Sequence, residues 1–320
     1  MSLFSFTCSI LLVAMSKTPS TAAPAPSGLL VGREFTYSMR PGDSLASVGS
    51  RFGVDPPVLG RQNGISMRAT IPVGRVLRID NRHIVPAVLE DGILINVPQR
   101  LLFYFEFGSL VAWYPVGMGR ADWQTPRGHF FIATKEEDPV WDVPRSIQEE
   151  MRREGKKVET RVPPGPRNPL GAYWMGLTLS SCGIHGTTAP TSVYRFQTHG
   201  CIRLHPDDVA DLFPRVSIGT PVEVVYRPVL AARLEDGSLW VESHPDVYRA
   251  DKQPLKILDE LEIATGYRTL AREAIRKREG IATRVPSSHP GKHPGAAVTP
   301  TPRFPQTATG ASAPRTRRLP

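Results

Sequence analysis

Residues 184–204 read IHGTTAPTSVYRFQTHGCIRL and bring together His185, His199 and Cys201, each beside a glycine. These residue types serve in three kinds of site: a bound metal, half of a disulfide, or a thiol nucleophile with its base. The spacing inside this stretch and the sequence around it distinguish the three.

A metal site is the first alternative, with His185, His199, Cys201 and His205 as candidate ligands. Zinc sites usually pair their ligands at close spacing, as in Cys-x-x-Cys or His-x-x-x-His. Here 13, 1 and 3 residues separate successive candidates, and no carboxylate completes the set. We therefore predict no metal at this stretch and no other cofactor for the chain.

A nucleophilic Cys201 fits the stretch better. A thiol acts as its thiolate, so it needs a neighbour that lowers its pKa or takes its proton, and histidine titrates near neutral pH. His185 ends a β-rich run sixteen residues upstream, and the intervening chain can return Cys201 to its side. Gly200 lets the backbone approach a substrate carbonyl, where backbone N–H groups can face an oxyanion. A helix predicted from Pro206 favours the thiolate through its dipole.

A disulfide between Cys182 and Cys201 is the remaining alternative, since Cys8 falls in a segment that export would remove. Cys182 and His185 are three residues apart in an extended run, so their side chains should face opposite ways. This parity predicts that Cys182 is a core thiol and does not pair with Cys201.

The N-terminus carries an apolar run, Leu3 to Met15, followed by small residues. It has the length of a signal peptide and is too short to span a bilayer as a helix. We predict a signal peptide at residues 1–25, an exported protein and no stable membrane span. The alternatives are a buried strand or a start codon placed too early.

Residues 34–80 predict a strand, two capped helices and a closing strand. The positions that carry the pattern resemble a LysM module: Tyr37, Gly42, Asp43, Ser44, Leu45, Phe52, Gly53, Val54, Leu59, Asn63, Ile65, Ile71, Pro72, Gly74, Leu77 and Ile79. The resemblance implies binding to N-acetylglucosamine-containing glycans; the alternative is a spacer domain. Gly49 stands where alanine is common and should weaken the first helix by up to about 1 kcal/mol.

From Ile93 the sequence changes to short β-rich runs separated by Pro, Gly and polar turns. This predicts a mainly β catalytic domain over 93–228. Residues 229–280 predict a hairpin and a helical extension interrupted near Gly266. Residues 281–320 are rich in Pro, Thr, Ala and Arg and predict a disordered tail. The tail holds six of the basic residues that give the net charge of +9. It has one aromatic, Phe304, so we do not predict nucleic-acid binding.

Several spaced motifs now match one family in order: TPRGHFFI, EEDPVW, VPPGPRNPLGAYWM, GIHG and THGCIRLHPDDVADLF. They resemble L,D-transpeptidases of the YkuD fold, and within them the ErfK/YbiS-type branch of Gram-negative bacteria. The resemblance covers about half of the chain. It implies a β-sandwich-like catalytic domain, preceded here by the small βααβ LysM domain.

The resemblance also implies a role for each candidate residue. Cys201 would be the nucleophile and His185 its base and later its acid, oriented by the Gly186 carbonyl. Backbone N–H groups at His199, Gly200 and Cys201 would form the oxyanion hole. Arg203 would bind a substrate carboxylate or brace the loop, the alternative being a structural salt bridge. Thr198, where the family often has serine, is grouped with the substrate-binding residues.

The implied enzyme is a periplasmic cysteine acyltransferase of the cell wall. Cys201 would form a thioester with diaminopimelate of a stem tetrapeptide and release D-alanine. A second diaminopimelate would then give a crosslink, an outer-membrane lipoprotein lysine would give an anchor, and water would make the enzyme a carboxypeptidase. Hydrolysis of finished wall links by the same pair of residues stays open. A wall-binding protein without catalysis is the alternative of a different class.

Overall fold

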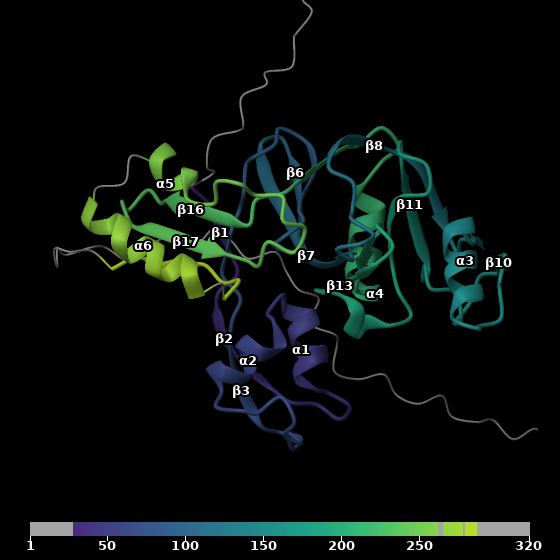
Figure 1. Cartoon of the computed structure of the whole chain (residues 1–320), viewed down its shortest axis with the longest axis horizontal. Helices are drawn as coiled ribbons and strands as arrows, with labels where there is room; N and C mark the ends of the chain where they lie inside the picture. Colours follow the sequence, from purple (N-terminus) through teal and green to yellow (C-terminus); the bar gives the residue numbers. More distant parts are fainter. Residues whose placement is uncertain (1–27, 262–264, 278, 287–320) are drawn as a thin grey trace, which may run out of the picture.

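The computed structural model describes residues 28–261, 265–277 and 279–286 of the 320-residue chain. The predicted signal peptide and most of the predicted tail lie outside these residues. Figure 1 shows three parts: a small helix-containing unit at the bottom, a large β body, and a strand-and-helix layer at the left. Among the described helices, none combines the length and the apolar character that crossing a membrane requires.

The small unit contains β2 (Glu34–Ser38), α1 (Leu45–Phe52), α2 (Pro56–Gln62) and β3 (Val76–Asp80). The two strands pair antiparallel. Ser44 begins α1 with a capping box, in which its side chain accepts from the Ser47 N–H and Ser47 returns the contact. Leu59, Leu77 and Ile79 are fully buried in its core. The predicted βααβ unit is confirmed.

Gly49 has a role in this unit that the sequence did not reveal. Its carbonyl accepts the Val54 N–H at 3.0 Å, where the chain folds back beyond the end of α1. A Cβ at this position would lie 2.4 Å from the Val54 carbonyl oxygen. Glycine is therefore needed for this close approach, a reason for Gly49 that is separate from its predicted weakening of the helix.

The body is built on one nine-stranded sheet in the order β13-β7-β14-β12-β11-β8-β15-β5-β6. Its strands are β5 (Gly92–Asn96), β6 (Leu101–Glu106), β7 (Ser109–Gly119), β8 (Gly128–Glu137), β11 (Tyr173–Leu177), β12 (Gly183–His185), β13 (Phe196–Thr198), β14 (Ile202–Leu204) and β15 (Pro221–Val225). β7 is long enough to pair with β6 by its first half and with β13 and β14 by its second. The sheet thus folds over on itself around an apolar core, and the mainly β prediction is confirmed.

Three connecting segments of the sheet contain helices. The segment between β8 and β11 carries β9 (Trp141–Asp142), α3 (Arg145–Arg153) and β10 (Arg161–Val162), and we call it the lid. The helices η1 (Pro190–Ser192), α4 (Pro206–Leu212) and η2 (Phe213–Arg215) follow β12 and β14. Val209 and Leu212 of α4 pack into the sheet core.

The C-terminal layer consists of β16 (Val229–Arg233), β17 (Leu239–Ser243), α5 (Lys256–Glu260), α6 (Thr265–Lys277) and β18 (Thr283–Arg284). β18 pairs with β17, and Ile281, Ala282 and Val285 are buried. The prediction of a disordered tail from residue 281 is therefore wrong for residues 281–286, because Ile281 packs into the core of the small unit and Val285 into the core of this layer. The predicted helix break lies before Gly266, which belongs to α6.

The three parts meet at a buried joint. β1 (Leu30–Val31) pairs with β4 (His83–Ile84), which follows the small unit directly. Arg100 of the sheet body, 6% exposed, makes a bidentate ion pair at 2.8 Å with Asp55, the residue before α2. Glu242 of β17 accepts from His83 at 2.9 Å and from His244 at 2.7 Å. We call these five residues the joint cluster.

Candidate active site

Cys201 lies in the short loop between β13 and β14. Gly200 has φ +105°, a conformation that side chains rarely adopt, so glycine is required there. The Thr198 hydroxyl donates to the Cys201 carbonyl at 2.6 Å and accepts the Gly200 N–H at 3.2 Å. Thr198 therefore braces the loop from inside, where it is 2% exposed.

His185 ends β12, which runs parallel to β14 with Ile184 opposite Ile202 and His185 opposite Arg203. This pairing brings the histidine strand beside the cysteine loop. The Nδ1 of His185 donates to the Gly186 carbonyl at 2.6 Å, which leaves Nε2 to face the thiol. Trp174 of β11 packs beside the imidazole with ring centroids 5.8 Å apart. The imidazole is 3% exposed and has one orientation available.

The surroundings of Cys201 favour its thiolate. The pKa of Cys201 lies well below its ordinary value, first because the Cys182 thiol hydrogen-bonds to it, and then because His185 does so and adds its charge. Burial opposes the shift without reversing it. A thiolate next to an imidazole is a nucleophile that is already deprotonated, with an acid at hand for a leaving group.

His199 points away from Cys201 and toward the lid. Its Nε2 is in contact with the Glu150 carboxylate of α3, and its ring packs edge-on against Trp123 with centroids 4.5 Å apart. Arg120 binds the same carboxylate at 3.1 Å. His199 hydrogen-bonding lowers the pKa of Glu150, so the carboxylate is charged. We call Arg120, Glu150 and His199 the lid cluster.

Arg203 lies on β14, with its guanidinium at the site. Its Nη1 donates to the Ser192 hydroxyl at 3.0 Å, while its buried Nε has no partner. Burial lowers the pKa of Arg203, and the Cys201 thiolate raises it. Among the ion pairs of the described residues, none includes Arg203. The structural salt bridge that the sequence left open is absent from this part of the chain.

The remaining metal-ligand candidate, His205, lies outside this arrangement: its Nδ1 accepts the Asp207 N–H at the start of α4. A different group, His83, Glu242 and His244, has ligand atoms within 4.8 Å of one another and could hold an ion. These three are buried in the joint cluster and hydrogen-bonded to each other, away from Cys201.

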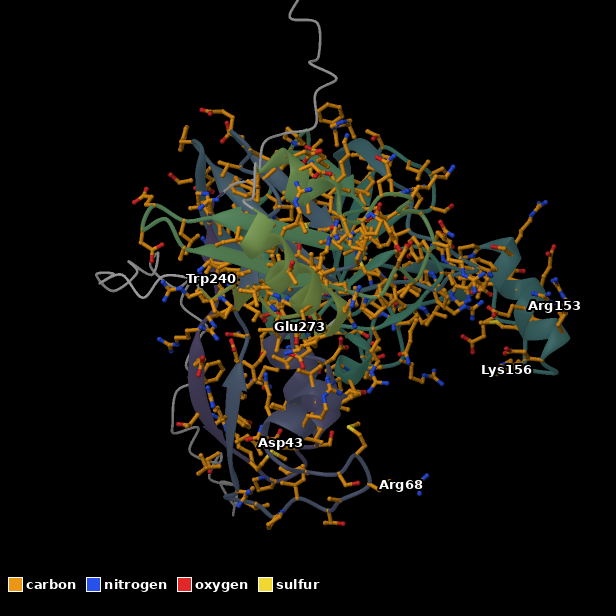
Figure 2. All side chains as sticks on the ribbon, turned by 60° about the vertical axis from the view of Figure 1, so that its left-hand side comes forward. Asp43, Arg68, Arg153, Lys156, Trp240 and Glu273 are labelled. Carbon is orange, nitrogen blue, oxygen red and sulfur yellow. The ribbon has the colours of Figure 1, made fainter. Side chains whose placement is uncertain are left out.

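A cavity of about 530 Å³ opens over the site between the sheet and the lid. Its lining includes Cys201, His185, Arg203, Trp174 and Glu150. The lid projects from the body, and Figure 2 shows Arg153 and Lys156 at its outer end. An extended peptide can thus reach the thiol with its polar groups facing both cations and carboxylates.

Three contributors to the site were missed by sequence reasoning: Cys182, Trp174 and Glu150. The helix SIQEEMRREGKK was recognised, but nothing local indicates that its Glu150 reaches a histidine 49 residues away. Gly183 is the sequence feature that could have indicated the position of Trp174, because a Cβ at Gly183 would lie 2.5 Å from the Trp174 ring. Cys182 was placed in the core, where it is, but its link to Cys201 was not expected.

Comparisons with known proteins define the class of enzyme. Residues 90–224 match the YkuD model, described as the L,D-transpeptidase catalytic domain, and residues 37–80 match the LysM domain. The chain belongs to the L,D-transpeptidase family and is an acyltransferase. Among its relatives, the "Probable L,D-transpeptidase ErfK/SrfK" of Salmonella typhimurium is 30% identical, over 88% of this chain and 96% of that protein.

Further relatives fall in the same family. The "Probable L,D-transpeptidase YbiS" of Escherichia coli K12 is 30% identical, over 66% of this chain and 73% of that protein. A solved L,D-transpeptidase from Mycobacterium smegmatis is 19% identical, with a TM-score of 0.36, and the match covers 64% of this chain and 95% of that one. The family resemblance predicted from the sequence is confirmed.

Proposed function

We propose that this protein is an exported L,D-transpeptidase that acts on peptidoglycan stem peptides through a thioester on Cys201. The observation that carries the proposal is the placement of His185, held through Nδ1 by the Gly186 carbonyl, on the strand beside the Cys201 loop, where it lowers the pKa of Cys201. The Gly186 carbonyl takes the place of a triad carboxylate. It accepts the Nδ1–H of His185 and so orients Nε2 toward the thiol.

In the first half-reaction the Cys201 thiolate attacks the carbonyl between diaminopimelate and the terminal D-alanine. A tetrahedral oxyanion forms, and His185 gives its proton to the leaving D-alanine nitrogen. The carbon–nitrogen bond breaks and a thioester remains. In the second half-reaction His185 takes a proton from the attacking amine, and the thiolate leaves.

The oxyanion needs backbone donors at the cysteine loop. We assign this role to the N–H groups of His199 and Cys201. The Gly200 N–H donates to the Thr198 hydroxyl, so this hydrogen bond must break before Gly200 can donate to the oxyanion. We assign Thr198 to bracing the loop and not to contact with substrate.

Arg203 is assigned to a substrate carboxylate. Its buried Nε has no partner and no protein carboxylate pairs with it in the described residues, so this partly buried cation is available to an anion. Stem peptides carry carboxylates at diaminopimelate and at the terminal D-alanine. Binding one of them would fix the scissile bond over Cys201.

The LysM unit is proposed to bind the glycan strands that carry these peptides. The Asp55–Arg100 ion pair joins it to the catalytic body, so glycan binding would hold the cavity at the wall. The location is then the periplasm. The acceptor is a diaminopimelate amine or the lysine of an outer-membrane lipoprotein, with water as the alternative that makes the enzyme a carboxypeptidase.

The test uses the full chain with purified tetrapeptide muropeptides, and with isolated cell walls for binding. Wild type should release D-alanine, and mass spectrometry should find a dimer, a lipoprotein adduct or a tripeptide according to the acceptor. Cys201→Ala should lose D-alanine release and keep wall binding. If D-alanine release survives in Cys201→Ala, the mechanism is wrong; if wild type binds walls without any release, the protein is a wall-binding module.

A further inference from the structure

The two described cysteines lie together in a crossed arrangement. The Cys182 sulfur lies 3.7 Å from the Gly200 carbonyl oxygen, and the Cys201 sulfur lies 3.6 Å from the Ser181 carbonyl oxygen. Each acceptor belongs to the residue that precedes the other cysteine. These crossed contacts bring the two cysteines side by side.

The sheet register brings the backbones of the two cysteines close together. β12 and β14 are parallel, with Ile184 opposite Ile202. Continuing that register backwards sets Gly183 opposite Cys201, which makes Cys182 the diagonal neighbour of Cys201. Strands about 4.8 Å apart with a rise of about 3.3 Å per residue place diagonal Cα atoms about 6 Å apart. Cysteines joined by a disulfide have Cα atoms about 4.4 to 6.8 Å apart.

The parity argument that separated the two cysteines fails for a local reason. Cys182 precedes β12 instead of lying in it. Ser181 has φ +62° and Gly200 has φ +105°, so neither chain is regularly extended at the point where the thiols emerge. Alternation of side chains holds only along an extended strand. Alternation therefore does not decide whether Cys182 and Cys201 can pair, and both thiols are free in this structure.

The two thiols are chemically unequal. Hydrogen bonding to Cys201 raises the pKa of Cys182, while the pKa of Cys201 is lowered by the same bond and by His185. Cys201 lines the cavity, whereas Cys182 is buried at 6% exposure. A peroxide that enters the cavity therefore reacts with the thiolate of Cys201 first, while Cys182 stays a protonated thiol.

We propose that Cys182 is a resolving cysteine that captures oxidised Cys201 as a reversible disulfide. The Cys201 thiolate attacks a peroxide, the O–O bond breaks, and a sulfenic acid and hydroxide form. The Cys182 sulfur then attacks the sulfenic sulfur, and the hydroxyl leaves with the Cys182 proton as water. A dithiol reverses the step by exchange, leaving both protein thiols free and becoming a disulfide itself.

The consequence is protection of the nucleophile. A sulfenic acid without a nearby thiol proceeds to sulfinic and sulfonic acids, which dithiols do not reduce. The internal disulfide stops that progression and also blocks acylation while it lasts. This inference rests on the proposed function for the value of protecting Cys201, but the disulfide itself requires only the two thiols.

The test compares the full-length wild type with Cys182→Ser, Cys182→Ala and the exposed control Ser180→Ala during a hydrogen peroxide titration. Wild type and the control should lose two hydrogens in nonreducing mass spectra and yield a linked peptide containing Cys182 and Cys201. Their D-alanine release should return after dithiothreitol. The Cys182 variants should gain two or three oxygens at Cys201, with irreversible loss on the order of tenfold greater at equal peroxide.

Two results separate this inference from the proposed function. Equal overoxidation of wild type and both Cys182 variants, without a linked peptide, would overturn the role of Cys182. Melting curves check that the variants fold, and Cys182→Ser keeps a small donor at the buried position. If untreated wild type releases no D-alanine but forms the linked peptide, the redox pair stands and the transpeptidase proposal fails.

Discussion

Two clusters in this molecule use the same three kinds of side chain, a carboxylate, histidine and arginine, in opposite settings. In the joint cluster the side chains of His83, Glu242 and His244 are 0% exposed. In the lid cluster the side chains of Arg120, Glu150 and His199 are 33%, 16% and 27% exposed. The first connects parts of the chain far apart in sequence; the second connects a helix to the active-site loop.

The difference teaches how burial changes the meaning of an ion pair. Glu242 accepts from His83, His244 and Gln99 with one oxygen and from the Ile84 N–H with the other, so both carboxylate oxygens have protein donors. Removing one member would leave buried polar groups without partners. Water reaches the lid cluster and can replace its contacts, so the lid can release without a large cost.

The largest expected effect is on stability. Glu242→Ala should lower the free energy of unfolding by about 3 to 5 kcal/mol, because buried histidines and an N–H lose their acceptor. Glu150→Ala should cost less than about 1 kcal/mol. Urea unfolding followed by tryptophan fluorescence measures both. Equal losses for the two variants would contradict the distinction between a buried joint and an open lid.

A smaller effect is expected in the coupling between Asp55 and Arg100. A double-mutant cycle with Asp55→Asn and Arg100→Gln should give a coupling of about 2 kcal/mol, since the pair is bidentate and mostly buried. The matched cycle on Arg120 and Glu150 should give less than about 0.5 kcal/mol. Limited proteolysis between the LysM unit and the body should speed up only in the first cycle. Coupling energies of equal size in the two cycles would contradict the distinction between the buried joint cluster and the exposed lid cluster.

The same contrast decides what the sequence could predict. The LysM unit and the pairing of His185 with Cys201 depend on short-range signals: caps such as Ser44, strand alternation and motif spacing. Glu242 and His83 are 159 positions apart, and neither has a local feature that selects the other. The contact of Cys182 with the Cys201 loop depends on the positive φ of Ser181, which a rule for regular strands cannot foresee.

Acid should affect the joint cluster through its titrating groups. Burial lowers the pKa of His244 although Glu242 opposes this, and the contacts with His83 and His244 depress the pKa of Glu242 against the effect of burial. Both shifts favour the deprotonated form in the folded state. The contribution of His244 to stability is therefore complete above about pH 6.5 and is lost as the pH falls below that value. The contribution of Glu242 is lost as the pH falls below about 4.5.

Each such proton can contribute at most about 1.4 kcal/mol per pH unit. Asp55, Arg100 and His83 also lie near His244. Urea unfolding between pH 8 and 4 should show the loss of stability beginning near pH 6.5. His244→Gln should flatten the first part of the curve while leaving the second. A wild-type curve that stays level to pH 5 would show that His244 does not titrate as its burial requires.

The smallest energetic effect concerns the lid and is read in kinetics. Glu150→Gln should raise KM for tetrapeptide by about fivefold, corresponding to about 1 kcal/mol, because the lid wall of the cavity loses its charged link to His199. kcat should hold, since Glu150 contacts neither Cys201 nor His185. Glu149→Gln, the same charge change at the exposed neighbouring position, is the control and should leave KM unchanged.

Salt sharpens this last prediction. Screening weakens partly exposed pairs, so the wild-type KM should rise with ionic strength toward that of Glu150→Gln, which should respond little. Rates of D-alanine release at several substrate concentrations separate KM from kcat. A fall in kcat at constant KM would instead mean that Glu150 acts through His199 on the oxyanion, and the lid cluster would then belong to the catalytic machinery rather than to substrate entry.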